Sequence, residues 1–347
     1  MTKLRVRIPV STISDRSHSR HLFEAMGRSP HLTQVDEGQS ADVAFNEGPA
    51  TLNVFRVQSD PHALSHLRPV SEMIVDWAEP AMTQAVKMVP TLSSAFLAQW
   101  LHWVRNIDEH PFPQNPFPTK GKGWDVMTAW MTDPYKRILQ PASDLPFLRV
   151  PFCVPEWFFH TTLEEERPFD VFFTGAIGRF YPIRILVTNH LRSREAKDII
   201  FRLISTTPRE KTSDIPVFDK HQNWYADCLR QSKTILFCGS IINVPVQKFY
   251  ESMACGCLVM APLPKDAAIN GFVDGETMVV IDHLNYLDKL RYYLKNNTER
   301  RRITRNAARL IQRNHTCSAR VGLLTERLTQ ILDGVPAEET PDELIPW

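Results

Sequence analysis

Short apolar runs alternate with helix-patterned stretches throughout the second half of this chain. Each apolar run is four to six residues long, which suits a strand buried on both faces. The expected strands cover residues 169–174, 199–203, 234–238, 258–261 and 278–281, and the expected helices cover 182–191, 224–231, 245–254, 284–296 and 298–313. Strands that alternate with helices at this spacing indicate an α/β fold with a parallel sheet and crossover helices.

The first half shows the same alternation less regularly. We expect strands at 4–10, 42–45, 52–57, 72–75 and 124–130, and helices at 19–26 and 93–104. The segment PFPQNPFP at 111–118 contains four prolines, which remove backbone donors and exclude regular structure there. A chain of 347 residues is long enough for two domains.

A proline-marked segment separates the two halves. FLRVPFCVPEWFF at 147–159 and the acidic LEEER that follows it are typical of a linker. We therefore expect an N-terminal domain at 1–150, a linker at 151–164, a C-terminal domain at 165–325 and a tail at 326–347.

The composition argues against several classes of protein. Lys plus Arg number 40 and Asp plus Glu number 39, and a net charge of +1 argues against a dedicated nucleic-acid binder. No run approaches the roughly 20 apolar residues of a membrane-spanning helix, and the N-terminus has no signal-peptide pattern. The six cysteines lack a framework spacing, and Cys255 and Cys257 form only a C-x-C. We therefore expect reduced thiols, no metal site and a cytoplasmic protein.

In open α/β sheets, ligands bind at the carboxyl ends of the strands, where helix N-termini offer free N–H groups. The first such place follows the strand at 169–174. There Gly175 permits a close approach of the backbone, and Arg179 and Arg184 could neutralise a diphosphate. The alternative is a tight strand–helix turn with two solvent-exposed arginines.

Two further places carry candidate binding residues. Gly239 and Ser240 lie at the tip of the next buried strand, whereas Lys233 precedes that strand and is better explained as a solvated lysine. Lys248 and Glu251 are three residues apart on one helical face. A carboxylate there can accept both hydrogens of a ribose diol while the lysine faces phosphate. The alternative for this pair is an exposed salt bridge.

A series of motifs runs in order across residues 150–320. They are VPFCVPEWFF, FDVFFTG, YADCLRQSKTILF, KFYESMACGCLVMAP, FVDGETMVV and LRYYLKNNTERRRITRNAARLIQRNHTCSAR. On these motifs the second half resembles the nucleotide-sugar domain of GT-B glycosyltransferases, and is most similar to family 4 and to the spore-maturation type. The resemblance implies a GT-B fold, in which two Rossmann-like domains with parallel sheets face a cleft. The domain at 1–150 would hold the acceptor.

The resemblance also implies roles for single residues. Family 4 members carry a Glu-x(7)-Glu pair, in which Glu251 matches the second, ribose-binding glutamate. Asn243 occupies the first position, and an asparagine cannot carry negative charge opposite an oxocarbenium ion. The co-substrate would be a nucleoside diphosphate sugar, of UDP or GDP type. Its diphosphate would be stabilised by Arg179, Arg184 and Lys248 without a metal, since no convincing D-x-D motif is present.

In inverting members of this fold, the first domain also holds a general base. Asp15 and His18 follow the first expected strand, and an Asp–His pair could deprotonate an acceptor hydroxyl. The alternative is a polar loop with capping residues. The candidates for an aromatic acceptor platform, for which core packing is the alternative, are Trp100, Trp103, Phe112, Phe117, Trp124 and Trp130.

These expectations combine into a glycosyltransferase that moves a hexose or pentose from a nucleoside diphosphate to a hydroxyl group. The acceptor would be a saccharide, a small metabolite or a modified nucleic-acid base. The even charge balance disfavours nucleic acid. The basic face of a late helix, formed by Arg302, Arg305, Arg309 and Arg313, has a solvated helix as its simpler explanation. The alternative function is a non-catalytic nucleotide-sugar-binding protein, suggested by Asn243.

Overall fold

The structure is a computed structural model that describes residues 3–8, 19–36, 38–45, 50–56, 84–89, 147–159, 166–175, 181–192, 196–204, 215–239, 245–264 and 266–337. The chain divides into two compact units. Unit 1 consists of Met1–Asp15, Phe23–Pro151 and Val321–Trp347, and unit 2 of Arg16–Leu22 and Phe152–Arg320. The short segment 16–22 belongs to unit 2. The rest of unit 2 is continuous, because the chain enters it after Pro151 and returns to unit 1 after Arg320.

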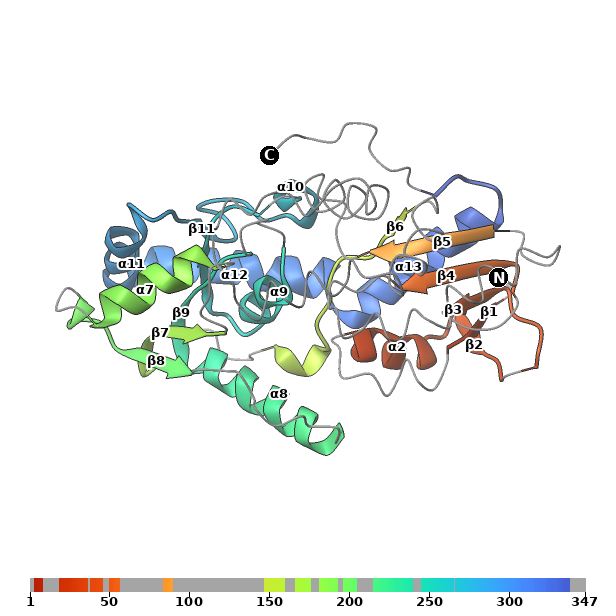
Figure 1. Cartoon of the computed structure of the whole chain (residues 1–347), viewed down its shortest axis with the longest axis horizontal. Coiled ribbons are helices and arrows are strands. Elements are labelled where there is room, and N and C mark those ends of the chain that lie inside the picture. Colours follow the sequence, from red (N-terminus) through yellow and green to blue (C-terminus); the bar gives the residue numbers. More distant parts are fainter. Residues whose placement is uncertain are drawn as a thin grey trace, which may run out of the picture. The chain divides into compact units, whose positions relative to one another are not determined.

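Unit 1 is built on a parallel sheet with the strand order β2-β1-β3-β4-β5-β6 (Figure 1). Its elements are β1 (Leu4–Arg7), α2 (Ser19–Gly27), β2 (Leu32–Gln34), β3 (Val43–Phe45), β4 (Leu52–Arg56), β5 (Gln84–Val89) and β6 (Phe147–Arg149). Helix α2 packs on this sheet through Phe23, whose ring lies edge-on to that of Phe45, with the centroids 5.5 Å apart.

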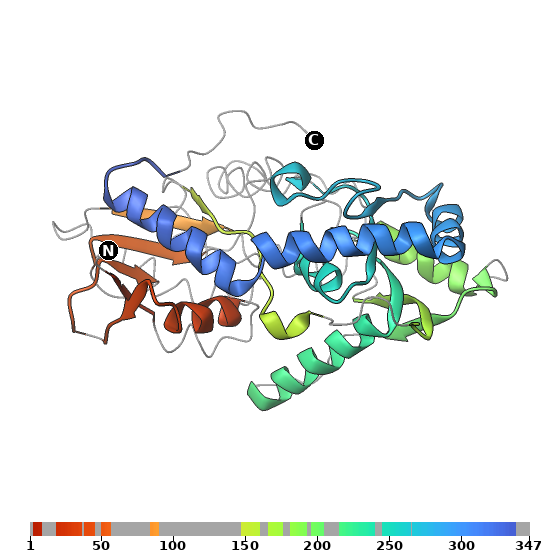
Figure 2. The same ribbon diagram turned by 180° about the vertical axis from the view of Figure 1, so that it is seen from behind.

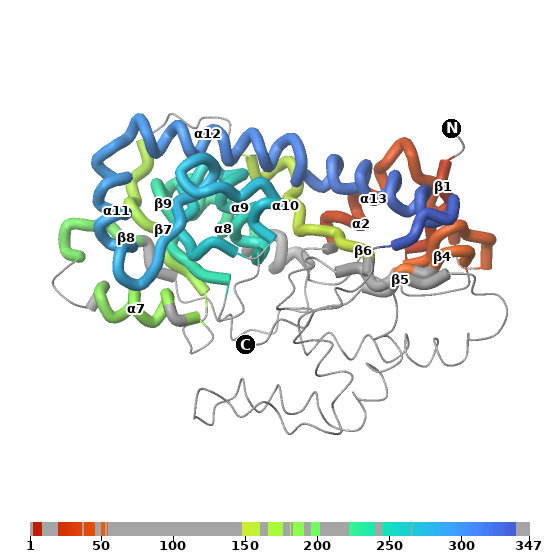
Figure 3. Tube along the Cα trace, turned by 90° about the horizontal axis from the view of Figure 1, so that it is seen from above, coloured from red at the N-terminus to blue at the C-terminus, as the bar shows by residue number. Residues whose placement is uncertain are grey.

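Unit 2 holds a second parallel sheet, in the order β11-β10-β9-β7-β8. Its strands are β7 (Phe169–Thr174), β8 (Phe201–Ile204), β9 (Ser232–Leu236), β10 (Leu258–Ala261) and β11 (Val279–Val280). Its helices are η2 (Glu156–Phe158), α7 (Pro182–Arg192), α8 (Ile215–Arg230), α9 (Gln247–Ala254), α10 (Ala267–Asn270), α11 (Tyr286–Lys295) and α12 (Asn297–Asn314), and α13 (Cys317–Leu332) begins in this unit. Helices α7 and α12 lie on opposite sides of β7 and β9 (Figures 2 and 3).

The sheet of unit 2 is buried on both faces, because successive side chains of a strand point to opposite sides. Phe172 and Ile235 point to the face where side chains of α8, α9 and α12 pack. Their neighbours Val171 and Leu236 point to the other face, against α7 and α11. These four side chains are fully buried, which explains why the strands appear in the sequence as continuous apolar runs.

The parallel α/β architecture expected from the sequence is confirmed, with several boundaries moved. Helix α8 begins at Ile215 instead of 224, and the strands β2 and β5 were not expected. The proline-marked segment 147–159 was expected to be typical of a linker, but its first residues form β6, which pairs with β5 and precedes the expected linker at 151–164. Helix α13 runs through Leu332, into the region expected to be a tail. The elements expected at 72–75, 93–104, 111–118 and 124–130 lie outside the described residues.

The segment after β6 is fixed to the junction between α12 and α13. Val154 forms a parallel bridge with Thr316. The Val154 N–H donates to the His315 carbonyl oxygen, and the Cys317 N–H donates to the Val154 carbonyl oxygen, both at 2.9 Å. The incoming segment of unit 2 is therefore held by strand-like pairing to the segment that leads out of it.

His315 is a buried structural residue at this junction, with 4% of its surface exposed. Arg320 donates to its Nδ1 at 2.6 Å, and its Nε2 donates to the Asn270 carbonyl oxygen at 3.0 Å. Because a guanidinium cannot accept and a carbonyl cannot donate, the ring is neutral with its proton on Nε2. Burial, together with the charge of Arg320, lowers the pKa of His315 to about 4.

We expect His315→Phe to lower the free energy of unfolding by about 1–3 kcal/mol, because it removes two buried hydrogen bonds. The phenyl ring keeps the edge-on contact with Tyr250, whose ring centroid lies 5.1 Å away. Urea denaturation at neutral pH measures the loss. His283→Phe, at an exposed histidine, is the control and should change little. Equal stability of the wild type and His315→Phe would show that the network contributes nothing.

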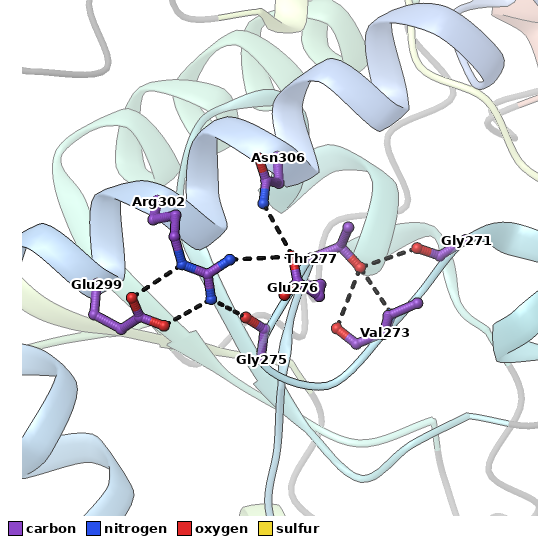
Figure 4. A network of polar contacts seen from close by, with 8 residues as sticks. All are labelled: Gly271, Val273, Gly275, Glu276, Thr277, Glu299, Arg302 and Asn306. Atoms are coloured by element: carbon purple, nitrogen blue, oxygen red, sulfur yellow. Dashed lines mark hydrogen bonds and ion pairs between the residues drawn. The ribbon is translucent and has the colours of Figure 1, made fainter.

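Arg302 fixes the loop between α10 and β11 to helix α12 (Figure 4). Its guanidinium forms ion pairs with Glu299 at 2.7 Å and with Glu276 at 3.1 Å, and it donates to the Gly275 carbonyl oxygen. The basic face expected on this helix is therefore partly neutralised, because its first arginine is paired with two carboxylates.

Candidate functional site

The carboxyl ends of β7 and β9 meet at one edge of the sheet in unit 2. The two strands are parallel neighbours, with Phe172 opposite Ile235. After β7 the chain turns into α7, which begins with Pro182, a residue suited to the first helical position. After β9 the chain leads into α9, which begins at Gln247. The first turns of two helices therefore offer N–H groups at this edge, the arrangement that binds anions.

Gly175, Arg184 and Lys248 come together at this edge. A Cβ built on Gly175 would lie 2.6 Å from both Arg184 Nη1 and Lys248 Nζ. Lys248 Nζ donates to the carbonyl oxygen of Thr174, the last residue of β7, at 2.9 Å. The backbone at Gly175 has a φ of +108°, which side-chain-bearing residues rarely adopt. Glycine is thus required here, and it lets two cationic side chains lie against the backbone.

Arg184 is buried, in contrast to the solvent-exposed arginine of the alternative explanation. Only 5% of its surface is exposed, and its Cζ lies 4.0 Å from the centroid of the Tyr181 ring. Burial lowers the pKa of Arg184. The protein thus holds a cation with little solvation, a state that an anionic ligand would stabilise.

Glu251 is also buried, with 3% of its surface exposed, so it does not form the exposed salt bridge considered as its alternative role. Burial raises the pKa of Glu251 to about 8. Burial and the neighbouring charge of Arg184 lower the pKa of Lys248 to about 7. The lysine and the carboxyl group are therefore both held away from their usual charge states, which marks a functional-site candidate.

Two residues that the sequence analysis missed lie close to this group. The hydroxyl oxygen of Tyr225, on α8, is buried, and the pKa of the hydroxyl is raised well above the usual value by burial and by Glu251. Cys238, just after β9, interacts electrostatically with both Arg184 and Lys248. Tyr225 lies in the YADCLRQSKTILF motif, but its helical position gave no sign that the hydroxyl approaches the site.

Several predicted site residues lie outside the described part of the chain. These are Asp15, His18, Arg179, Ser240 and Asn243, whose roles remain predictions. Lys233 is placed at the other end of β9, as expected, but it forms an ion pair with Asp170 at 2.7 Å instead of being only solvated. Within the described ranges, His, Cys, Asp and Glu form no group of three that could hold a metal ion. None of the helices in those ranges is long and apolar enough to cross a membrane.

The charged groups of this site suit particular chemical groups of a ligand. The buried cation Arg184, the half-buried cation Lys248 and the first turns of two helices suit an anion such as a diphosphate. A buried carboxyl group on the same helix as Lys248 suits a ligand with adjacent hydroxyl groups.

Comparisons with known proteins bear on the whole chain and on its second half. Residues 190–326 match the family described as glycosyl transferase-like. The solved structure of Anabaena Alr3699/HepE in complex with UDP has a TM-score of 0.50 and 7% identity, over 95% of this chain and all of that one. The sucrose-phosphate synthase from Thermosynechococcus elongatus has a TM-score of 0.47 and 12% identity, over 96% of this chain and all of that one. No curated protein sequence matches the chain.

Proposed function

We propose that this protein transfers a sugar from a nucleoside diphosphate sugar to an acceptor hydroxyl, because residues 190–326 match the family described as glycosyl transferase-like and the chain has the GT-B fold. The donor would bind at the edge of the sheet where β7 and β9 end. The observation that carries this proposal is the group of Gly175, Arg184 and Lys248, in which two cationic side chains flank a glycine that is needed for its positive φ.

The diphosphate would occupy the space beside Gly175. Arg184 and Lys248 lie on the first turns of two different helices, so their charges add to those of the free N–H groups there. Together they would stabilise the negative charge that develops on the diphosphate as the bond to the sugar breaks. Because these groups supply the positive charge, the diphosphate would bind without a metal ion. Arg179 would add a third cation.

Glu251 would bind the ribose. A carboxylate has two oxygens, and each can accept a hydrogen bond from one of two adjacent hydroxyl groups. Its burial excludes water as a competitor, so bonds to it are strong once it is ionised. Ser240 and Asn243 follow β9 in the sequence, and we propose that they contact the donor as well. Asp15 and His18, near the start of the sequence, would deprotonate the acceptor hydroxyl.

A panel of nucleotides tests the proposed donor site. Thermal melting of the full chain is measured with UDP, GDP, ADP, UDP-glucose and GDP-mannose, and then with the matching nucleoside monophosphates. A ligand that binds the folded state raises the melting temperature by mass action. We expect at least one diphosphate to raise it and the matching monophosphate to raise it much less. UDP is the first probe because the HepE structure is described as a complex with UDP. No shift with any diphosphate would contradict the proposal.

Asn243 keeps a second function open, namely nucleotide-sugar binding without catalysis. Release of free sugar from the best-binding donor separates the two functions. Slow hydrolysis that is lost in Lys248→Ala supports a transferase, whereas tight donor binding with no release of sugar, with or without simple saccharide acceptors, favours a binding protein.

The pH dependence of donor binding should be bell-shaped, with its maximum between about pH 7 and pH 8. The donor would bind best to an ionised Glu251 and a protonated Lys248, whose pKa values are about 8 and about 7. Affinity therefore falls at low pH as the glutamate gains a proton and at high pH as the lysine loses one. We expect about a 20-fold loss from pH 7.5 to pH 5.5.

Isothermal titration calorimetry with a nucleotide sugar measures this profile, because its diphosphate does not titrate in this range. Glu251→Gln should remove the acidic limb, and Lys248→Arg should remove the alkaline limb. A flat profile in the wild-type protein would contradict the proposed charge states.

A further inference from the structure

Cys153 and Cys317 bring two thiols together where the chain passes between its two units. Their Sγ atoms are 3.3 Å apart, and the residues are 5% and 1% exposed. Cys153 lies just after Pro151, where the chain enters unit 2, and Cys317 lies just before Arg320, where the chain returns to unit 1. We propose that these two cysteines are a disulfide-forming pair, which a hydroperoxide oxidises and which then joins the two passing segments covalently.

The backbone around both cysteines is already held in place for such a bond. The strand-like pairing of Val154 with Thr316 places Cys153 and Cys317 on either side of one bridge. Gln247 Nε2 donates to the Cys153 carbonyl oxygen at 2.8 Å, which fixes that segment to helix α9 as well. A bond of about 2.05 Å therefore needs only a small approach of two side chains.

One equivalent of peroxide is enough to oxidise the two thiols to one disulfide. The thiolate of one cysteine attacks a peroxide oxygen, which gives a sulfenic acid and an alcohol, or water when the oxidant is hydrogen peroxide. The thiol of the other cysteine then displaces the hydroxyl group of the sulfenic acid, so that the Sγ–Sγ bond forms and water leaves. The two cysteines together lose two electrons and two protons, and the peroxide is reduced.

Cys255 provides an internal comparison in the same unit. It is fully buried, and its thiol donates to the Phe158 carbonyl oxygen at 3.3 Å. Its hydrogen-bond partner is thus a carbonyl oxygen and not a second thiol, and burial raises the pKa of this thiol well above its usual value. We therefore expect Cys255 to stay reduced under conditions that oxidise the pair.

The disulfide would close a loop between positions that are 164 residues apart in the sequence. A cross-link over a long loop restricts the unfolded chain strongly and so favours the folded state. It would also hold together the segments that lead into and out of unit 2. We expect the melting temperature to rise by about 5–10 °C when the bond forms.

The test uses the whole folded chain, which is treated with one equivalent of hydrogen peroxide, alkylated and digested without reductant. Mass spectrometry should find the peptides of Cys153 and Cys317 joined, while Cys255 carries the alkyl label. Thermal melting of the same sample should show the expected rise, and dithiothreitol should reverse it. Failure to find the joined peptides, or oxidation of Cys255 to the same degree, would overturn the proposal.

Three variants complete the test, each compared with itself before and after oxidation so that a change in basal stability does not matter. Cys153→Ser and Cys317→Ser should show no rise in melting temperature with peroxide. Cys255→Ser should show the same rise as the wild type. A rise that persists in Cys153→Ser would mean that another pair is responsible, and it would overturn the assignment.

Discussion

Replacing Glu251 with glutamine is expected to weaken binding of the nucleoside diphosphate about 100-fold, because it removes two charge-assisted hydrogen bonds. The amide has nearly the same shape as the carboxyl group, but one of its two polar atoms donates and cannot accept from a hydroxyl group. Calorimetry at pH 7.5 measures the loss, and the donor's rate of hydrolysis should fall by a similar factor.

The stability of the same variant separates a binding role from a structural one. Burial raises the pKa of Glu251, so the folded protein disfavours the charge of this carboxyl group. Glu251→Gln removes that charge, so we expect the melting temperature of the ligand-free protein to stay constant or to rise. Sites that bind ligands often carry such a cost to stability.

Glu326→Gln is the matched control, because this glutamate is exposed on α13. It should bind the nucleotide with the affinity of the wild type. If Glu251→Gln also binds like the wild type, the assignment of Glu251 to the ribose is wrong. If it binds weakly and also melts at a much lower temperature, the residue supports the fold.

The sequence predicted unit 2 well because its strands carry an unambiguous signal. The residues of β7 and β10 point to two buried faces, so each strand is a continuous apolar run between polar turns. Gly175 and Lys248 were found for the same reason, since the ends of such strands are easily located. Their proximity could not be predicted, because it depends on the order β9-β7 in the sheet.

Other features depended on contacts between distant parts of the chain. Strand β6 lies between prolines and is stabilised by its pairing with β5, a partner far away in the sequence. Arg302 was expected to be one exposed arginine among several, but Glu276, on a loop 26 residues earlier, neutralises it. His315 was recognised as part of a motif, yet its partner Asn270 lies 45 residues away. Local pattern alone contains no information on such pairs.

Gly175→Ala is expected to weaken nucleotide binding about 100-fold or more, because its Cβ would occupy the place where the two cations lie. The new methyl group would stand 2.6 Å from Arg184 Nη1 and from Lys248 Nζ, so both side chains must move. At the same time the φ of +108° becomes strained, at a cost of about 1–3 kcal/mol in stability.

Strain and displacement can be separated with glycines that have positive φ but open space. A Cβ on Gly275 (φ +71°) or on Gly38 (φ +88°) would meet no atom within 4 Å. Gly275→Ala and Gly38→Ala should therefore lower the melting temperature while nucleotide affinity stays within about twofold of the wild type. Gly175→Ala should lower both, and the loss of affinity should persist at low temperature, where each variant is fully folded.

A second change tests whether the lost affinity arises from the displaced cations. In Lys248→Ala the lysine has already been removed, so adding Gly175→Ala can displace only Arg184. The two changes should then cost less together than the sum of their separate effects, as expected for residues that share one site. Full additivity of the two changes would mean that Gly175 acts through the backbone alone. The group of Gly175, Arg184 and Lys248 would then not be the diphosphate site.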